Sequence, residues 1–482
     1  MTMPSESHRI YLADCYDPPQ PPVTRQQSRR RELVILIVAY RNANLLRECL
    51  AAAHTHLPGI PVYVWDNSGP DYAGADEMTK VVAEYPDVHW YLGSANIGFA
   101  AAVNALTREV PDYDFILLNP DAILQGPLTD TLAAIQCGGV AAASPLTIEH
   151  DTHSKHRRSW DTAHREQSLS RALVAWSGYA TKIRGSRCSD LYERRPDIVE
   201  GYLTGACLAV SRDAWDRVGN FDEEFFLYGE EADWQRRARS AGWSLRLVDE
   251  PGIVHTGHGT VAGDPTAGLR SQDLLRANIA LNLEFENGRR CADAFLVGST
   301  VLDRVQRSVR RARTARRRPP GARPSVLITM NQLTSAQVER QHALLAAELD
   351  RRGYEVIIVC VGRFGPPVSM VTPSVRVIRQ TWWLPLIDTA PGQSVVISGS
   401  TPAETGFATL WRAANRSRRW LVAAPPSSPN NPRCSRAHAV AMHRCDGAVT
   451  VDGVLGAGEL DNGLAIDGLA DTYESAIAEV LR

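Results

Sequence analysis

Short apolar segments rich in β-branched residues alternate with amphipathic segments along most of this 482-residue chain. The first, LVILIVAY at residues 33–40, is apolar throughout, which is typical of a strand buried on both faces. The next strand patterns are PVYVWD ending at Asp66, VHWYLG, and DFILL at 114–118, and helical patterns cover about 44–54, 76–84 and 99–109. This alternation predicts a mostly parallel sheet covered by helices on both faces.

The first region continues beyond residue 198 after a change of character. Residues 150–200 are basic and have few apolar runs, which indicates a mobile loop-and-helix insertion. Order is expected to return in a strand at 208–210, a helical turn at 212–218, a helix at 231–241 and a strand at 244–249.

A second series of strand and helix patterns begins at Ser325. Its strand patterns are SVLITM, EVIIVCV, VRVIRQ, SVVISGS, WLVAAP and GAVTVDG, and the helix after the first is expected to start near Thr334 or Ser335. The series has neither G-x-G-x-x-G nor a Walker A sequence, so no phosphate cradle is predicted there. It predicts a second, Rossmann-like α/β domain.

Composition sets the domain limits and the compartment. The polar, proline-rich residues 1–31 predict a disordered tail, followed by a first domain at 32–290, a basic helix and linker at 291–323 and a second domain at 324–482. Nine scattered cysteines, none spaced Cys-x-x-Cys, argue against a disulfide framework or a zinc site and for a reducing compartment. A net charge of −2 gives no global field for nucleic acid, and no apolar run reaches about 20 residues, so we expect a cytoplasmic protein.

The segment at 301–318 is a basic amphipathic helix. Val301, Leu302, Val305 and Val309 fall at helical spacing, and nine arginines but no acid lie between residues 304 and 323. Such a run is commonly a solvated linker, but it also fits a helix that contacts anionic lipid headgroups. The sequence leaves both interpretations open.

Polar groups follow several strands of the first region. Tyr40, Asp66 and Asp121 all fall at strand ends, the last in the run LLNPD, and NIGFAAAVN places Asn96 and Gly98 in a turn before a helix. Either acid alone is explained by turn or capping chemistry. Because ligands of such sheets bind outside the carboxyl ends of the strands, the set together predicts a ligand site at this edge.

Two further motifs add acid–base and metal-binding groups. YGEEAD places Glu230, Glu231 and Asp233 at a helix start, where acids complement the helix dipole, but adjacent carboxylates near apolar residues also raise one pKa, which suits a general base. VHTGHGT places His255 close to a strand end, and a histidine that meets a strand-end aspartate forms a plausible metal pair.

These blocks, in this order over about residues 33–260, resemble family 2 glycosyltransferases, especially the rhamnosyltransferase-like branch that builds cell-surface glycans. The resemblance implies a GT-A fold and an inverting, metal-dependent transfer from a nucleotide sugar. Site roles follow by position: Tyr40 and Asp66 for the nucleoside, Asn96, Gly98, Asn104 and Asn119 for the donor pocket, Asp121 and His255 (with His258 in reserve) for Mg²⁺ or Mn²⁺, Glu231 and then Asp233 as base, and Thr204 and Gly205 toward the acceptor.

The chain departs from the family pattern at two places. The family's Glu-Asp pair is Glu230-Glu231 here, so the base carries a longer side chain, and misplacement by about 1 Å affects rate. In AYRN, Arg41 separates Tyr40 from the asparagine that usually follows it, so Asn42 is given no role.

The resemblance favours dTDP-L-rhamnose as donor and a cell-surface glycan or glycolipid as acceptor. Another donor such as UDP-galactofuranose, or a sugar nucleotidyltransferase activity, remains an alternative, although AYRNANLL lacks the glycines of a triphosphate loop. The C-terminal series resembles one half of a GT-B glycosyltransferase, best in LLAAELDRRGYEVIIVCVG, and is interpreted as a non-catalytic appendage for docking or acceptor capture. No nucleic-acid partner is expected.

Overall fold

The protein forms two compact units, residues 1–263 and 264–482, each with its own sheet. The computed structural model describes residues 31–70, 72, 74–149, 157–255, 265–314, 323–333, 337–365, 368, 371–372, 374–424, 432–450 and 463–482. His258 and the helix cap expected at Thr334 or Ser335 lie outside these residues.

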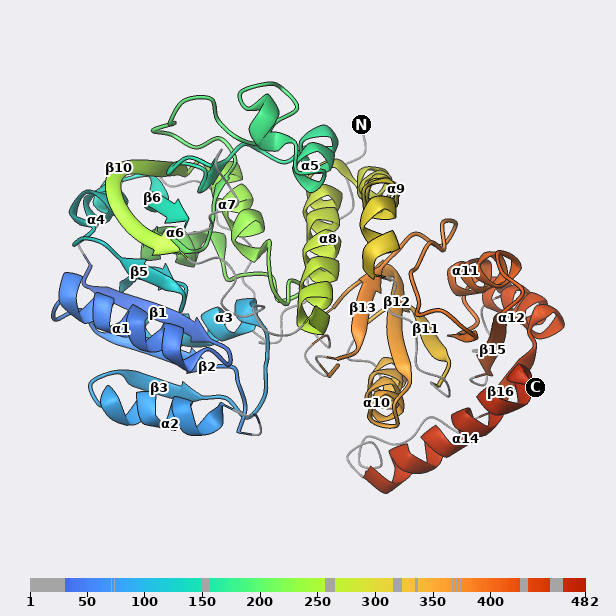
Figure 1. Cartoon of the computed structure of the whole chain (residues 1–482). Helices are drawn as coiled ribbons and strands as arrows, with labels where there is room; N and C mark the ends of the chain where they lie inside the picture. The colour runs from blue at the N-terminus through green and yellow to red at the C-terminus, as the bar shows by residue number, and fades with distance from the viewer. Residues whose placement is uncertain are drawn as a thin grey trace. The chain divides into compact units, whose positions relative to one another are not determined.

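The first unit is an α/β layer structure whose elements match the predicted alternation (Figure 1). In chain order they are β1 (Leu33–Ala39), α1 (Ala43–His56), β2 (Val62–Asp66), α2 (Ala75–Glu84), β3 (His89–Leu92), α3 (Phe99–Glu109), β4 (Asp114–Leu118), β5 (Ala122–Leu124), α4 (Thr129–Gln136), β6 (Val140–Glu149), β7 (Ala163–His164), α5 (Leu169–Trp176), η1 (Ala180–Ile183), β8 (Tyr202–Leu203), β9 (Cys207–Val210), α6 (Arg212–Val218), α7 (Glu230–Ser240) and β10 (Ser244–His255).

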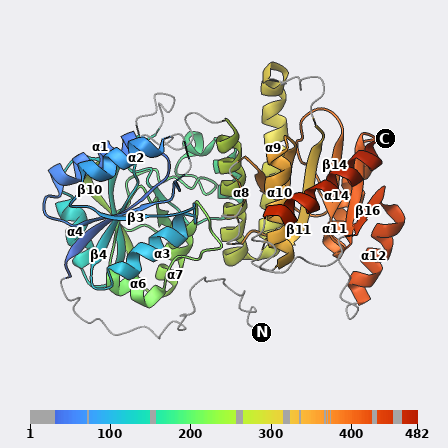
Figure 2. The ribbon, with the colours of Figure 1, turned by 90° about the horizontal axis from the view of Figure 1, so that it is seen from below.

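The sheet of the first unit has the order β3-β2-β1-β4-β9-β6-β10-β5. The first four strands are parallel, β9 runs antiparallel to β4 and β6, and β10 is parallel to β6. Alternate β1 residues enter two cores, because Val34 and Leu36 pack with α3, α6 and α7, whereas Ile35 and Ile37 pack with α1, α2 and α4. Figure 2 shows the helices on the two faces, which confirms the predicted mostly parallel sheet.

The segment predicted as a mobile insertion is tied to the first unit in its described part, 157–199. Arg184 forms a bidentate ion pair with Asp161 at 2.5 and 2.7 Å, and both side chains are buried. β7, which belongs to the segment, pairs antiparallel with β8, the short strand that precedes β9. Some of the basic residues of the segment are therefore used internally, in the Arg184–Asp161 pair and in hydrogen bonds from Arg165 and Arg171 to backbone carbonyls.

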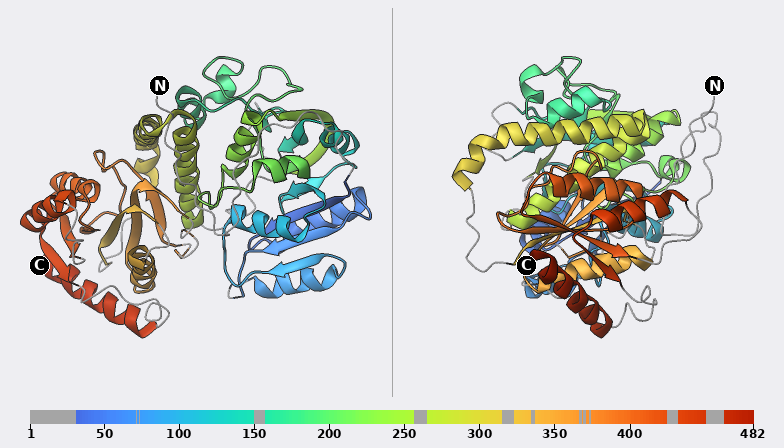
Figure 3. Two further views of the ribbon diagram at one scale, coloured as in Figure 1. Left: turned by 180° about the vertical axis from the view of Figure 1, so that it is seen from behind. Right: turned by 90° about the vertical axis from the view of Figure 1, so that its right-hand side faces the viewer.

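The second unit contains six parallel strands in the order β13-β12-β11-β14-β15-β16, the doubly wound order of a Rossmann-like sheet. Figure 3 shows α10 and α14 on one side of this sheet and α9 and α11 on the other. Its elements are α8 (Pro265–Asn287), α9 (Arg289–Thr314), β11 (Ser325–Gln332), α10 (Gln337–Arg351), β12 (Glu355–Arg363), β13 (Arg376–Arg379), β14 (Ser394–Ser398), α11 (Pro402–Ala413), β15 (Arg418–Ala424), α12 (Pro432–Arg444), β16 (Gly447–Thr450) and α14 (Gly463–Leu481).

The helix α8 packs in the second unit, whereas the sequence boundary at residue 290 placed it with the first. Three of its charged side chains bind that unit: Arg270 donates to the carbonyls of Val371 and Val375, at 3.0 and 3.1 Å. Asp273 pairs with Arg376 at 2.8 Å, and Glu284 pairs with Arg363 at 3.0 Å and with Arg379. Among the described residues, every helix is too short or too polar to cross a membrane.

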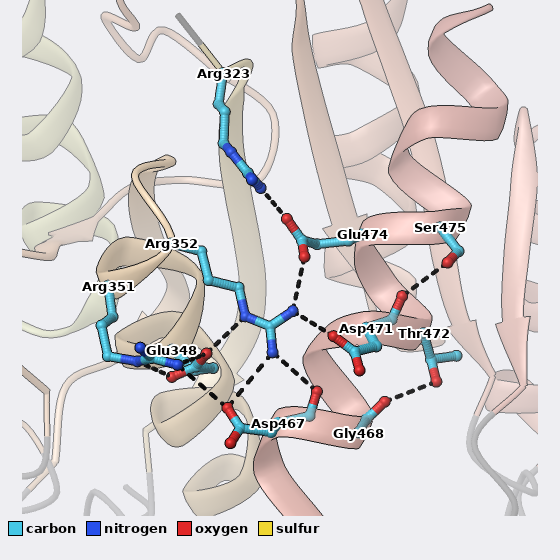
Figure 4. Close-up of polar contacts among 10 residues, drawn as sticks. All are labelled: Arg323, Glu348, Arg351, Arg352, Asp467, Gly468, Asp471, Thr472, Glu474 and Ser475. Carbon is cyan, nitrogen blue, oxygen red and sulfur yellow. Dashed lines mark hydrogen bonds and ion pairs between the residues drawn. The ribbon is translucent and has the colours of Figure 1, made fainter.

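A network of ion pairs joins α10 to α14 (Figure 4). Arg352 lies at its centre and reaches Glu348 and Asp471 at 2.6 Å and Glu474 at 2.7 Å. Hydrogen bonds from Arg351 and Arg352 lower the pKa of Glu348 from 4.5 to about 2, although burial acts in the opposite direction. Because the carboxylate is preferred in the folded chain, its stabilisation is present above pH 4.5 and is lost as the pH falls toward 2.

We expect Glu348→Gln to lower the melting temperature of the second unit at pH 6 and to have a progressively smaller effect as the pH is lowered toward 2. Glutamine resembles the protonated acid, so the two proteins converge once Glu348 is protonated. Thermal unfolding followed by circular dichroism over this pH range measures the difference. A difference that stays constant with pH would show that Glu348 acts by packing and not by charge.

Candidate active site

The carboxyl ends of β1 and β2 place two predicted site residues at one edge of the sheet. The parallel register pairs Ala39 with Asp66, so Tyr40 follows directly beside this acid. Asp66 is buried, and one of its oxygens accepts from the N–H of Ser68 at 2.9 Å. The structure therefore brings Tyr40 and Asp66 to adjacent strand ends, as the sequence predicted.

Asn67 connects this edge to the turn before α3. Its N–H donates to Ala39, its amide nitrogen donates to the carbonyl of Gly98 at 3.0 Å, and its amide oxygen accepts from the N–H of Ile97 at 3.2 Å. Asn96 accepts from the N–H of Gly98 at 2.9 Å and closes the turn. Asn67 was not among the predicted site residues, because nothing local in WDNSG indicates that it would bind a second loop.

Glycine is required at position 98. Its φ is 92°, and a Cβ there would lie 2.7 Å from both the ring and the carbonyl oxygen of Phe226. The N–H of Phe99 also donates to that carbonyl at 2.8 Å. The Asn96–Gly98 turn is thus held against the loop that leads to α7.

Asp121 and His255 lie side by side, although 134 positions separate them (255 − 121). β5 pairs antiparallel with the end of β10, with Ala122 opposite His255, and this register sets Asp121 Oδ1 3.2 Å from His255 Nε2. Both side chains are mostly buried. Asn119 Nδ2 is 3.5 Å from the same imidazole nitrogen. β10 runs beyond the predicted end at 249 as far as His255, and this extension creates the pairing.

The Asp121–His255 pair fits a divalent cation by its donor chemistry. One carboxylate and one imidazole are ligands that Mn²⁺ and Mg²⁺ accept, and both ions usually take their remaining ligands from water or phosphate oxygens. No cluster of three or more His, Cys, Asp or Glu side chains suited to a metal occurs within the described residues. The pair therefore suits an ion that is also coordinated by a bound ligand, and not a structural metal site that is ligated by protein side chains alone.

Glu230 and Glu231 are the first two residues of α7. Burial raises the pKa of Glu230 well above its ordinary value, as does the charge of Glu231. Burial also raises the pKa of Glu231, while the N–H of Gly229, which donates to it at 3.1 Å, and the charge of His164 oppose this rise. Glu230 is almost fully buried, whereas Glu231 is half-buried, so Glu231 is the carboxyl group that a ligand can reach.

Asp233 is not available as the second candidate base. It is fully buried, and its two oxygens bind Arg236 at 2.6 Å and Arg237 at 2.9 Å. Arg237 in turn donates to the carbonyls of Val218 and Asn220. Proton transfer needs a carboxylate that can approach the reacting hydroxyl, so the geometry assigns Asp233 to fixing α7 against the preceding loop.

Asn104 likewise has a positioning role in place of the predicted donor contact. It is 1% exposed, donates to Phe221 at 3.0 Å and Glu223 at 2.9 Å, and accepts from the N–H of Phe221. These bonds attach α3 to the segment that leads into α7. The sequence shows a polar residue six positions after Gly98 but does not show that its side chain is buried.

Gly205, one of the two residues predicted to face the acceptor, lies beside Glu231, and Thr204 Oγ1 lies 2.6 Å from Thr162 Oγ1. A Cβ on Gly205 would be 3.8 Å from Glu231 Cγ, and the N–H of Asn119 donates to Ala206 at 3.0 Å. One turn after Glu231, Gln235 binds both the N–H and the carbonyl of Leu203, each at 2.8 Å. A chain of contacts thus leads from His255 through Asn119 and the segment Gly205–Ala206 to Glu231.

His164 and Asp190 are site-adjacent residues that the sequence did not indicate. His164 Nδ1 lies 2.9 Å from Asp190 Oδ2, and its ring stacks on Tyr202 with centroids 4.8 Å apart. Burial raises the pKa of Asp190, but the hydrogen bond with His164, the charge of His164 and weaker contributions from the backbone and Arg171 together hold it below its ordinary value. The pair belongs to the basic segment, where no motif marks it.

Arg41 also occupies a special place at the end of β1. It adopts a φ of 52°, its N–H donates to Ser68 Oγ at 2.8 Å, and its guanidinium lies 5.1 Å from the Tyr40 ring and 5.4 Å from the Tyr72 ring. Asn42 is buried and accepts from the N–H of Tyr40 at 3.3 Å. The departure in AYRN therefore places a cation beside the predicted nucleoside site.

Comparison with known proteins gives a consistent picture. N-acetylglucosaminyl-diphospho-decaprenol L-rhamnosyltransferases from two strains of Mycobacterium tuberculosis, CDC 1551 and H37Rv, are 28% identical over 260 residues, which cover 49% of this chain and 80% of theirs. No protein-family model matches the chain. These relatives confirm the resemblance predicted from the ordered sequence blocks.

Solved structures also align with the chain, at low similarity. The mannosyltransferase PcManGT from Pyrobaculum calidifontis, in complex with GDP-Man and Mn²⁺, is 14% identical over 62% of this chain and 80% of its own, with a TM-score of 0.37. Residues 1–349 of S. aureus TarS are 11% identical over 57% of this chain and 74% of theirs, with a TM-score of 0.36.

Proposed function

We propose that this chain, a glycosyltransferase with a GT-A unit and a second Rossmann-like unit, transfers a sugar with inversion from a nucleotide donor to a glycan or lipid-linked acceptor. The observation that carries the proposal is the 3.2 Å approach of Asp121 to His255, which a chain of contacts connects to Glu231. L-Rhamnose from dTDP-rhamnose is the favoured donor, because the curated relatives are named as rhamnosyltransferases. UDP-galactofuranose is the alternative donor.

Asp121 and His255 would hold Mg²⁺ or Mn²⁺, which neutralises the charge that collects on a departing nucleoside diphosphate. Tyr40 and Asp66 would hold the nucleoside, and the Asn96–Gly98 turn and Asn119 would border the donor. Arg41 would add a fixed positive charge on the nucleotide side, since the strained backbone at this residue directs its side chain over Tyr40 and Tyr72.

Glu231 would remove the proton from the attacking acceptor hydroxyl while Thr204 and Gly205 border the acceptor. A base with a raised pKa accepts that proton more readily than an ordinary glutamate does. Inversion requires only one such base, on the face of the sugar opposite the leaving group. A lipid-linked acceptor would place the protein at the inner face of the membrane, as a peripheral cytoplasmic protein.

The proposal is tested by mixing the purified chain with a panel of nucleotide sugars, with and without Mn²⁺. We expect dTDP-rhamnose with Mn²⁺ to raise the melting temperature most, since a ligand at 100 times its Kd stabilises the fold by about 2.7 kcal/mol. Release of free dTDP should require both the metal and an acceptor or water. Stabilisation by nucleoside triphosphates alone would favour a nucleotidyltransferase instead.

A further inference from the structure

Two adjacent tryptophans are exposed in the loop that follows β13. Trp382 and Trp383 are each 46% exposed. The loop is fixed: Gln380 Nε2 donates to the carbonyl of Leu384 at 2.8 Å, and one edge of the Trp382 ring packs so closely on Gly406 that a Cβ there would lie 2.7 Å away. The structure therefore holds two large aromatic side chains in water on a well-attached loop, although burial of such side chains is strongly favourable.

The helix α9 lies next to this loop and exposes apolar side chains of its own. Thr300 Oγ1 is 3.5 Å from Gln380 Oε1, and Arg304 pairs with Asp388 at 3.8 Å, so these residues of α9 follow the loop. Between and beyond them, Val301 is 46% and Val305 is 68% exposed. These two valines are four residues apart and so share one face of the helix.

The helix α11 extends the apolar area on the other side of the loop. Leu410, which is 42% exposed, lies one helical turn beyond Gly406, the residue that contacts Trp382. Figures 1 and 3 show α9 and α11 on the same side of the second sheet. We name the set Val301, Val305, Trp382, Trp383 and Leu410 the tryptophan surface.

Beyond Arg304, which pairs with Asp388, the end of α9 is basic. From residue 304 to the end of α9 at Thr314 the helix carries five arginines and no acid. Tryptophan at the level of the headgroups, an apolar helix face and a run of arginines are the three features that bind a protein to an anionic bilayer interface. A protein partner or a second copy of the chain would need a complementary acidic surface.

We propose that the tryptophan surface and the arginines of α9 bind the headgroup region of an anionic lipid bilayer. The two tryptophan rings and the valines of α9 enter the interface, and the arginines bind lipid phosphates. This binding does not depend on sugar transfer or on a metal ion. Lipid binding would give the second unit, in which the sequence predicts no phosphate-binding loop, a role in holding the enzyme at a membrane surface.

The test is co-sedimentation of the full-length protein with vesicles of phosphatidylcholine alone or mixed with phosphatidylglycerol. We expect binding to the mixed vesicles, weakened by salt, and little binding to phosphatidylcholine. Trp383→Ser combined with Val301→Ser should weaken binding at least tenfold, and Arg307→Gln with Arg311→Gln should weaken it by about fivefold per charge. Leu92→Ser, which removes a 65% exposed leucine of the first unit, is the matched control and should bind like the unchanged protein.

Equal binding to both kinds of vesicle, or none, would overturn the proposal. So would a chain that is dimeric by light scattering and becomes monomeric on Trp383→Ser, because the surface would then join two copies. Each variant is first compared with the unchanged protein by thermal unfolding and by metal-dependent nucleotide release without vesicles. Loss of vesicle binding with normal nucleotide release separates this proposal from the proposed transfer activity.

Discussion

Replacement of Asp121 by alanine is expected to lower sugar transfer by about 10²- to 10⁴-fold while leaving the fold intact. The Asp121 carboxylate would supply one of the two proposed protein ligands, 3.2 Å from the other, and charge neutralisation by the ion would be worth several kcal/mol in the transition state. The measurement is nucleotide release at saturating donor over a Mn²⁺ titration, together with Mn²⁺ binding followed by electron paramagnetic resonance. We expect Mn²⁺ binding in the presence of nucleotide to be lost with activity.

Two further variants make this prediction specific. Asp112→Ala removes an exposed carboxylate near the opposite end of β4 and should leave both readouts unchanged. His255→Ala should resemble Asp121→Ala, and the double variant should lose little more than either single one, because both side chains serve one ion. Losses that multiply in the double variant, or normal Mn²⁺ binding by Asp121→Ala, would disprove the shared metal site.

The strands and helices between residues 33 and 118 could be predicted almost residue by residue, whereas β5, α4 and β6, which follow them, were not predicted. The pattern DFILL gave β4 at Asp114–Leu118, and the pattern after Gly98 gave α3 at Phe99–Glu109. Both depend on local properties, namely a strand buried on two faces and a helix with one apolar face. Asp121 could be placed at a strand end for the same reason, because parallel strands bring their carboxyl ends to one edge.

The parts that sequence could not give depend on contacts between distant segments. Asp233 has the same chemistry as Glu231 two residues earlier, and only its bonds to Arg236 and Arg237 exclude it as a base. His164 and Asp190 meet through the β7–β8 pairing in a segment whose composition suggested a mobile insertion. The helix α8 belongs to the second unit because Glu284 pairs with arginines of β12 and β13, which lie about 80 or more positions further along the chain.

The second large effect is expected for Glu231→Gln, which should lower kcat by about 10²- to 10⁴-fold with donor affinity unchanged. Glutamine keeps the size of the side chain and its bond from the Gly229 N–H, but it cannot accept the proton of the acceptor hydroxyl. The measurements are kcat with a saturating acceptor and the Kd of the donor by calorimetry. Weakened donor binding with unchanged kcat would instead place Glu231 in the donor pocket.

Glu230→Gln is the matched control, because Glu230 neighbours the proposed base but is not itself expected to accept the proton. Burial raises the pKa of Glu230 well above its ordinary value and so favours the neutral acid, which glutamine imitates. We therefore expect Glu230→Gln to retain most of the activity.

The acid limb of the kcat profile should lie above pH 4.5 in the unchanged protein, because burial also raises the pKa of Glu231, and should disappear in Glu231→Gln. In Glu230→Gln the limb should keep its position, because an uncharged glutamine replaces an acid whose neutral form burial favours. A limb that persists in Glu231→Gln would assign the base to another group.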